Sequence, residues 1–376
     1  MIEVANAINA EDPGERWWTY DANEKPPPFG HAVKSFWGFD PEKHAANVIG
    51  ADQEEVVLAP NALHAITTVF ANFEWKQGDV IIGANTAYIA VSRYIQYLSD
   101  RSEQPRPDVH TIDYAFPLTA EQILDKFRSK IQEVKELYHE VSFNDIPPSS
   151  YPQSDLRVED KKNKLVIVLD SITPMPSVAL PWKEMVKICR EEGAWSIVDG
   201  AQSIGQEARP LLDFFISNCH KWFYAKRGCA LLYVPKRNQY IIRSSIPTSA
   251  QYIARNDLDC VDAKRRSSNF VDQHAWTATI DLVPQLSVTP GGEEVINAYC
   301  HQLAIAGGKG LAEILGTEVL DVTGELTRNM ITAACFFYKG RWWCRCSAQV
   351  YNELADFEYI GRALKKICKD IEEPML

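Results

Sequence analysis

Two strand-like segments of this sequence end in residues that could perform chemistry together. The run 195–198 leads into Asp199, and the run 214–217 leads into a polar turn that contains Lys221. If both strands belong to one parallel sheet, their ends meet at the carboxyl edge, where α/β proteins bind ligands. A lysine amine can form a Schiff base and a carboxylate can hold a pyridinium nitrogen, so the pair predicts pyridoxal phosphate chemistry.

Each of these residues also has an ordinary interpretation. A lysine after a strand is usually solvated, and an aspartate after a strand usually caps a turn or a helix. The interpretation as a site is favoured because other polar residues gather at the same strand ends, namely Gln202, Asn218 and His220.

A phosphate group would need its own anchor, and the two common nucleotide-phosphate motifs are absent. Neither G-x-x-x-x-G-K-[ST] nor G-x-G-x-x-G occurs in the sequence. A strand-to-helix turn at residues 60–64 offers another solution, because the backbone amides of Ala62 and Leu63 at a helix start can bind phosphate. An ordinary helix cap at Asn61 explains the same segment equally well.

Composition limits the classes of protein to which the chain can belong. Its 376 residues are 46% hydrophobic and 24% charged, which is typical of a globular protein with a sizeable core. The net charge of −11 argues against a nucleic-acid partner and against an anionic membrane surface. The N-terminus lacks the pattern of a signal peptide, and no apolar run reaches the roughly 18 residues of a membrane span. We therefore expect a cytoplasmic protein.

The nine cysteines indicate core thiols in a reducing compartment. No C-x-x-C pair occurs, and Cys344 and Cys346 are the closest two in the sequence. No set of histidines and cysteines has the spacing of a zinc site, so no metal is expected.

Strand and helix patterns alternate for nearly 200 residues, which predicts an α/β fold with a mostly parallel sheet. The expected strands are 56–59, 79–83, 109–114, 164–170, 195–199, 214–218 and 229–234. The expected helices are 61–73, 88–98, 119–138 and 182–192, of which the third opens with a sequence close to a capping box.

The pattern changes after Pro235. Residues 236–285 are expected to be loop-rich, and the remainder predicts helices at 293–315 and 356–371 and strands at 318–322 and 342–347. We expect three parts, namely an arm or linker at 1–41, a large cofactor-binding α/β domain at 42–285 and a smaller, shortened α+β domain at 286–376.

Three motifs together resemble those of the class V aminotransferase family. They are Val-Asp-Gly-Ala-Gln-Ser-Ile-Gly at 198–205, Asp-Phe-Phe-Ile-Ser-Asn-Cys-His-Lys-Trp at 213–222 and Arg-Gly-Cys-Ala-Leu-Leu-Tyr-Val at 227–234. The resemblance covers about residues 45–376. Within the family, the chain is most similar to the fungal branch described as isopenicillin-N-epimerase-like, cysteine-desulfurase-like or hercynylcysteine-sulfoxide-lyase-like. The resemblance implies a fold-type I enzyme that binds pyridoxal phosphate and acts on an amino acid.

The resemblance also implies roles around the cofactor ring. Lys221 matches the lysine that forms the Schiff base and later moves protons, and Asp199 matches the acid that keeps the ring nitrogen protonated. Tyr88 matches the aromatic residue on the ring face, while Gln202 and Thr173 match polar groups near the ring hydroxyl. Tyr88 could instead be an ordinary aromatic residue at the start of its helix.

A second group of residues matches the phosphate contacts of the family. His220 and Asn218 match side chains near the phosphate, and the amides of Ala62 and Leu63 match the helix start. Thr279 matches a residue that reaches the phosphate from the partner subunit, which implies a homodimer with a shared active site. An ordinary strand threonine would explain Thr279 equally well.

Arg345 matches the arginine that binds the substrate carboxylate, a task that suits its planar guanidinium. The implied reaction is deprotonation at Cα through a quinonoid intermediate, followed by steps that the substrate side chain selects. We expect a C–S lyase or an epimerase-like activity, since no cysteine matches a desulfurase nucleophile. A transaminase, a cysteine desulfurase and a catalytically silent homologue remain as alternatives. A stacked structural arginine beside Trp342 and Trp343 is the alternative for Arg345.

The sequence also departs from the family pattern. Leu63 replaces a threonine whose hydroxyl would reach the phosphate, and Ala278 replaces a glycine. Family segments that usually follow Pro41 and Met330 have no counterpart here. A shortened gene product would explain both gaps.

Overall fold

A computed structural model describes residues 40–101, 105–143, 162–204, 213–275, 283–288, 293–321, 323–327 and 334–372. Its centre is a seven-stranded sheet of order β1-β7-β6-β5-β4-β2-β3. Neighbouring strands are parallel from β3 to β6, whereas β7 runs antiparallel to both β6 and β1. The sheet strands are β1 Val56–Ala59, β2 Val80–Ala84, β3 Asp108–Ile112, β4 Leu165–Asp170, β5 Trp195–Asp199, β6 Phe214–Asn218 and β7 Ala230–Tyr233. The α/β class and the mostly parallel sheet are confirmed.

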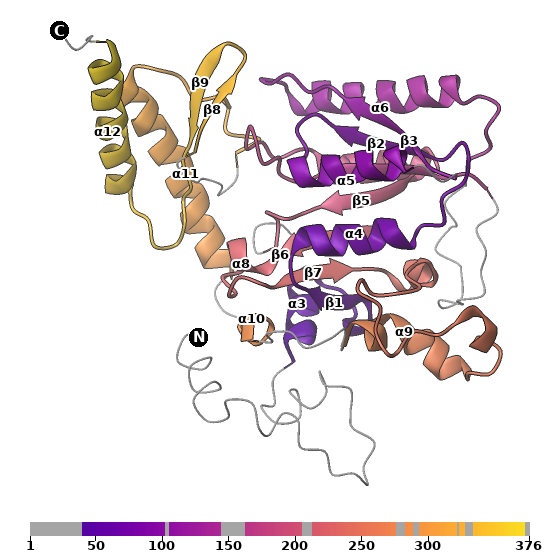
Figure 1. Cartoon of the computed structure of the whole chain (residues 1–376). Helices are drawn as coiled ribbons and strands as arrows, with labels where there is room; N and C mark the ends of the chain where they lie inside the picture. The colour runs from indigo at the N-terminus through magenta and orange to yellow at the C-terminus, as the bar shows by residue number, and fades with distance from the viewer. Residues whose placement is uncertain are drawn as a thin grey trace, which may run out of the picture.

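Helices cover both faces of this sheet (Figure 1). One hydrophobic cluster joins the sheet to α3, α6 and α7, and a second joins its other face to α4, α5 and α9. These helices are α3 Pro41–Ile49, α4 Ala62–Asn72, α5 Ile89–Asp100, α6 Ala120–Leu137, α7 Trp182–Glu191 and α9 Ala263–Ala275. The expected cap of α4 is present, since Asn61 accepts a hydrogen bond from the His64 amide at 2.8 Å.

Among the described residues, two short helices and three 3₁₀ turns connect the main elements. They are η1 Gln53–Glu55, α8 Cys219–Trp222, η2 Lys236–Ile241, η3 Arg255–Asp257 and α10 Val283–Leu286. The expected capping box of α6 is also present, because the Thr119 and Gln122 side chains each bind the other's backbone amide.

The C-terminal elements pack on one another beside the sheet (Figure 1). Helices α11 Glu293–Leu315 and α12 Leu354–Glu372 lie next to the antiparallel hairpin of β8 Ala334–Tyr338 and β9 Arg341–Arg345. Their shared cluster contains Leu303, Leu311 and Phe357 from the helices and Cys346 and Ala348 from the segment after β9.

Two expectations for this half of the chain are wrong. The strand expected at 318–322 is absent from its described part, because the Asp321 carboxylate accepts hydrogen bonds from the amides of Gly324 and Leu326 and folds the segment into a loop. The loop-rich segment 236–285 contains α9, whose inward side carries Asn269 and Gln273 beside Phe270. Because its buried side carries polar residues, the sequence of this helix lacks the hydrophobic periodicity by which a helix is predicted.

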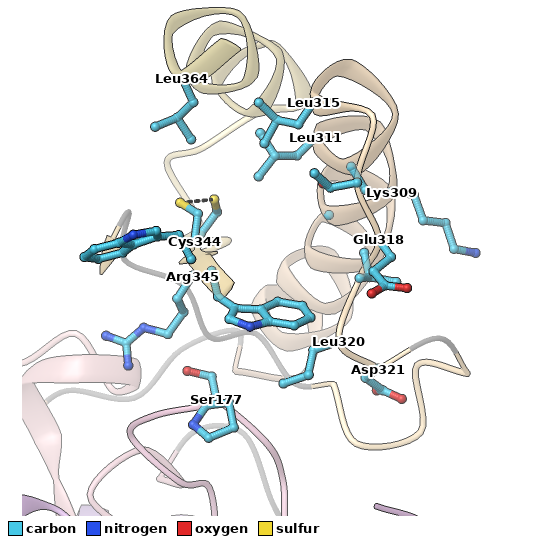
Figure 2. A pocket seen from close by; sticks show the side chains of 18 of the residues that line it. Ser177, Lys309, Leu311, Leu315, Glu318, Leu320, Asp321, Cys344, Arg345 and Leu364 are labelled. Carbon is cyan, nitrogen blue, oxygen red and sulfur yellow. Dashed lines mark hydrogen bonds between the residues drawn. The ribbon is translucent and has the colours of Figure 1, made fainter. Parts of the chain in front are cut away.

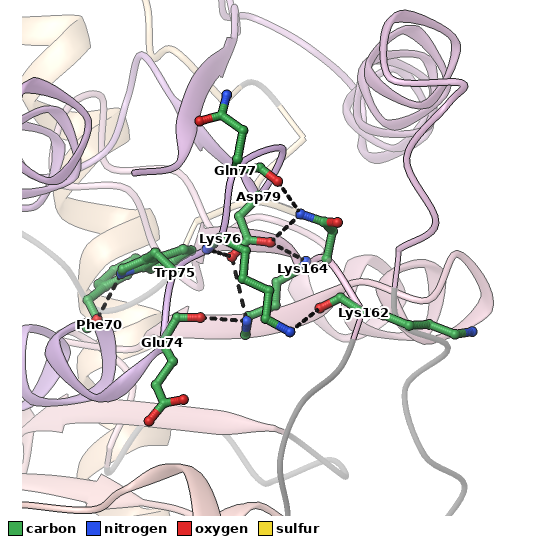
Figure 3. A network of polar contacts seen from close by, with 9 residues as sticks. Phe70, Glu74, Trp75, Lys76, Gln77, Asp79, Lys162 and Lys164 are labelled. Carbon is green, nitrogen blue, oxygen red and sulfur yellow. Dashed lines mark hydrogen bonds and ion pairs between the residues drawn. The ribbon is translucent and has the colours of Figure 1, made fainter. Parts of the chain in front are cut away.

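A buried polar network lies at the amino edge of the sheet, where β2 and β4 begin (Figure 3). Asp79 and Lys164 are 0% and 2% exposed, and their charged groups are 3.5 Å apart. Asp79 also accepts hydrogen bonds from the backbone amides of Lys76 and Lys164, while the Lys164 amine donates to the Glu74 carbonyl at 2.7 Å. The network joins the residues that immediately precede the two parallel strands.

Several expectations concern residues that the structure does not describe. Residues 1–39 of the arm or linker expected at 1–41, and residues 328–333 around Met330, lie outside the described residues. Among the helices that the structure describes, none combines the length and the apolar character that a membrane crossing requires.

Candidate active site

The carboxyl ends of β5 and β6 lie side by side, as the sequence predicted. In their parallel register Asp199 lies opposite Ile216, which precedes Lys221 in the chain. Gly200 is required directly after the acid, because a Cβ atom there would lie 2.4 Å from the ring of Phe215. The Gly200 amide donates to the Ile216 carbonyl at 2.7 Å, so the residue that follows β5 stays in close contact with β6.

Lys221 lies in the short helix α8, which begins directly after β6. Burial lowers the pKa of its amine, the charge of Asp199 acts in the opposite direction, and the positive charge of Arg345 adds to the lowering. Three segments distant in sequence therefore converge here. A lowered pKa favours the neutral amine, which is the form that attacks a carbonyl carbon.

Asp199 is 5% exposed, and burial raises the pKa of its carboxyl group. The Ala201 amide donates to this carboxylate at 3.0 Å, and both this hydrogen bond and Lys221 favour its charged form. The site thus holds a desolvated acid near a desolvated amine. Perturbed acid and base groups of this kind are typical of active sites.

A second buried acid, Asp170, lies beside Asp199 and was not among the predicted site residues. It ends β4 and is the register partner of Asp199. Burial and the Asp199 charge hold the pKa of Asp170 well above its ordinary value. The sequence signal was present, because Asp170 ends an expected strand just as Asp199 does.

Of the side chains predicted to contact the phosphate, Asn218 lies at the N-terminus of α4. Asn218 accepts a hydrogen bond from the Ala62 amide at 2.9 Å, which ties the end of β6 to this helix. The Asn61 side chain accepts a hydrogen bond from the His64 amide. Among the described residues, the Leu63 amide between them has no such acceptor.

His220 lies half-buried in the same turn as Lys221. Its Nδ1 is 3.2 Å from the Cys229 carbonyl oxygen, and burial lowers the pKa of its imidazole. With the Nδ1 proton donated to that carbonyl, Nε2 is left for an external partner.

The other predicted ring contacts differ in their surroundings. Gln202 accepts a hydrogen bond from the Trp222 indole at 3.1 Å, so it is tied to the neighbour of Lys221. Thr173 is buried in its own turn, where its hydroxyl contacts the Pro176 carbonyl and accepts from the Val178 amide. Tyr88 is 50% exposed at the start of α5.

Arg345 ends β9 and reaches from the C-terminal elements toward the sheet. It is half-buried, it contacts the Pro174 carbonyl through its guanidinium, and its charge acts on Lys221. Its position thus agrees with a role at the Lys221 site. Thr279 lies outside the described residues.

A cavity of about 980 Å³ lies between the C-terminal elements rather than over Lys221 (Figure 2). Its walls come from α11, α12, the β8–β9 hairpin and the loop around Asp321, and Arg345 is at its margin. Lys221 and Asp199 are not among the residues that line this cavity, so the cavity and the acid–amine pair are two different places.

Comparison with known proteins assigns this architecture. The family model described as Aminotransferase class-V matches residues 152–340. An L-cysteine desulfhydrase-like protein of Epichloe uncinata is 30% identical, with 87% of this chain and 82% of the relative covered. A hercynylcysteine sulfoxide lyase of Schizosaccharomyces pombe is 26% identical, with 93% and 88% covered.

Solved structures share the fold at low sequence identity. A cystine C–S lyase in complex with its product cysteine persulfide is similar over 97% of this chain and 93% of its own, with a TM-score of 0.62 and 13% identity. A cysteine desulfurase of Thermococcus onnurineus gives a TM-score of 0.58 at 14% identity, over 98% of this chain and 91% of its own.

The Epichloe alignment spans 403 positions, more than the 376 residues of this chain, so the relative has residues that this chain lacks. The match to the family model and the similarity to this relative agree with the motifs around Asp199 and Lys221. This chain belongs to the class V aminotransferase family of enzymes.

Proposed function

We propose that this protein is a pyridoxal-phosphate-dependent C–S lyase that acts on a sulfur-containing amino acid. The observation that carries the proposal is the convergence of Lys221, Asp199 and Arg345, each of them at least half-buried, at one edge of the sheet. The choice of reaction is supported by the curated relatives, whose names describe cysteine desulfhydrases and a sulfoxide lyase.

The side chains present suit this cofactor. Lys221 supplies an amine for the aldehyde, and Asp199 supplies a buried carboxylate for the ring nitrogen. The Leu63 amide at the N-terminus of α4 can donate to an anion. His220 Nε2 would donate to the phosphate only from the doubly protonated imidazole, because the Nδ1 proton goes to the Cys229 carbonyl. The Ala62 amide is already held by Asn218, so the helix start offers fewer free donors than the sequence suggested.

When bound, pyridoxal phosphate would supply an electron sink for the charge that develops at the substrate Cα. The protein's part is to bind and to move protons. Arg345 would hold the substrate carboxylate, and the released Lys221 amine would take the Cα proton. Burial lowers the pKa of Lys221 and so favours the neutral amine, which is the form that acts as a base.

A sulfur substituent on Cβ would then leave as the second half of an elimination. Loss of that group as a thiol or sulfide gives an aminoacrylate that hydrolyses to pyruvate and ammonia. An epimerase or transaminase would return a proton instead and would leave the C–S bond intact. Sulfide release therefore separates the proposed reaction from both.

We also propose a cytoplasmic homodimer in which Thr279 of one subunit reaches the phosphate of the other. The nine cysteines all being free thiols supports a reducing location. Thr173 and Tyr88 remain proposed cofactor contacts, the first near the ring hydroxyl and the second on the ring face.

An absorbance scan tests the cofactor. Purified protein with added pyridoxal phosphate should show a band near the visible edge that borohydride removes, and Lys221→Ala should lack it. Gln202→Ala, which leaves the amine in place, should retain a band. No band in the unaltered protein would contradict the proposal.

A panel of amino acids and cysteine conjugates then tests the reaction, with sulfide, pyruvate and ammonia as products. A second candidate is a catalytically silent homologue, which is favoured by the residues missing against the Epichloe relative and by the occupied Ala62 amide. A stable band without turnover of any conjugate would select that candidate.

A further inference from the structure

Four cysteines line the cavity between the C-terminal elements, and three of them lie in the β8–β9 hairpin or directly after it, with Cys344 labelled in Figure 2. Cys344 and Cys346 have their sulfur atoms 3.5 Å apart, and Cys335 lies opposite Cys344 in the β8–β9 hairpin. None of the three belongs to the Lys221 site. Within the described residues, no group of three or more ligating side chains is arranged to hold a metal ion.

The two closest thiols differ in their protonation. The hydrogen bond between the two sulfur atoms lowers the pKa of Cys346 and raises that of Cys344. A thiolate is the form of cysteine that attacks electrophilic sulfur. Cys346 is therefore the nucleophile of the pair, and Cys344 is the second thiol.

The spacing of the pair permits a bond between them. Two residues of extended chain span about 6.6 Å between Cα atoms, which is near the upper limit of roughly 6.8 Å for a disulfide. Both sulfurs lie on the cavity wall, although Cys346 itself is only 6% exposed. A cavity of this size can admit a small molecule.

We propose that Cys344 and Cys346 form a dithiol site that takes small-molecule disulfides by thiol–disulfide exchange. The Cys346 thiolate attacks one sulfur of the disulfide, forms a mixed disulfide and releases the first small thiolate, which takes up the proton of Cys344. The Cys344 sulfur then attacks Cys346, closes the internal bond and releases the second thiolate, which is protonated by solvent. The protein pair loses two electrons and the small disulfide gains them.

This site is independent of the cofactor, so it can be tested on the full chain whether or not Lys221 is active. The chain is incubated with hydroxyethyl disulfide, remaining thiols are alkylated, and the protein is cleaved with trypsin without reduction. Trypsin cuts after Arg341, Arg345 and Arg362, so only a disulfide can hold peptide 342–345 to peptide 346–362.

We expect that joined pair of peptides from the unaltered protein, its loss after reduction, and its absence from Cys346→Ser. Cys260→Ser, which removes an exposed thiol outside the cavity, should leave it unchanged. Peptide 329–339 joined to 342–345 would show that Cys335 is the partner instead and would overturn the proposal. So would recovery of Cys344 and Cys346 as alkylated thiols while Cys260 carries the mixed disulfide.

Discussion

The two edges of the central sheet each hold a buried acid and a buried or half-buried amine, but the two pairs differ in their hydrogen bonds and in their pKa values. At the amino edge, Asp79 and Lys164 are joined to each other and to the backbone of both strands (Figure 3). At the carboxyl edge, the charges of Asp199 and Lys221 act on one another, and both groups have shifted pKa values.

The two carboxylates differ in how many hydrogen bonds each one accepts. The Asp79 carboxylate accepts from the amides of Lys76 and Lys164 and from the side chain of Asn163, which leaves it little capacity for a ligand. Asp199 accepts one described backbone hydrogen bond, from Ala201. A buried pair that is fully hydrogen-bonded stabilises the fold, whereas a partly satisfied pair can exchange its protons and partners.

The largest expected difference is in the free energy of unfolding that is lost when each of the two lysines is replaced. Lys164→Ala should lower the free energy of unfolding by about 3–5 kcal/mol, because it leaves Asp79 charged and buried. Lys221→Ala should cost about 1 kcal/mol, because Asp199 has a raised pKa and can take up a proton. Urea unfolding of the cofactor-free proteins measures both values. Equal losses would show that the two edges do not differ in this way.

The next largest effect is expected at the close contact between Gly200 and Phe215, where β5 and β6 end side by side. Gly200→Ala should cost about 1–3 kcal/mol, since the new Cβ would overlap the Phe215 ring. Adding Phe215→Leu should recover part of the loss in thermal unfolding. Gly310→Ala is the matched control, because no atom lies within 4 Å of its Cβ position and alanine favours the helix. A similar loss in both single variants would contradict the overlap.

A smaller effect is expected where β6 is tied to α4. Asn218→Ala leaves the buried Ala62 amide without its acceptor, which should cost about 2 kcal/mol. Asn61→Ala removes only the cap of the same helix and should cost about 1 kcal/mol. Chemical denaturation compares the two. A neutral Asn218→Ala variant would mean that water replaces the bond.

The last expected effect is a pH dependence at the pair of acids, Asp170 and Asp199. Folding raises the pKa of Asp170, so the native state keeps a proton that the unfolded chain releases at its ordinary carboxyl pKa near 4. The free energy of unfolding should therefore fall as pH rises from about 4 to the raised pKa, by about 1.4 kcal/mol for each unit of elevation. Asp170→Asn should flatten this slope in the cofactor-free protein, whereas Asp52→Asn, at an exposed carboxyl group, should not.

Regular elements with a clear hydrophobic period were predictable from the sequence. The helix expected at 293–315 has those bounds, and the strands ending at Asp170 and Asp199 were placed within a residue. Helix α9 was missed because Asn269 and Gln273 occupy its buried side. The strand expected near Glu318 failed because side-chain hydrogen bonds of Asp321 outweigh the local β propensity.

For the site, the sequence by itself determined which chemical groups stand at the ends of β5 and β6, because strand ends and motif spacing are local properties. Only the tertiary structure decided that Asp170 lies beside Asp199, that Asn218 occupies the Ala62 amide, and that Arg345 acts on Lys221. The reason is physical. Burial and the neighbouring charges that shift a pKa come from strand order and from segments more than 100 residues apart, which no local pattern encodes.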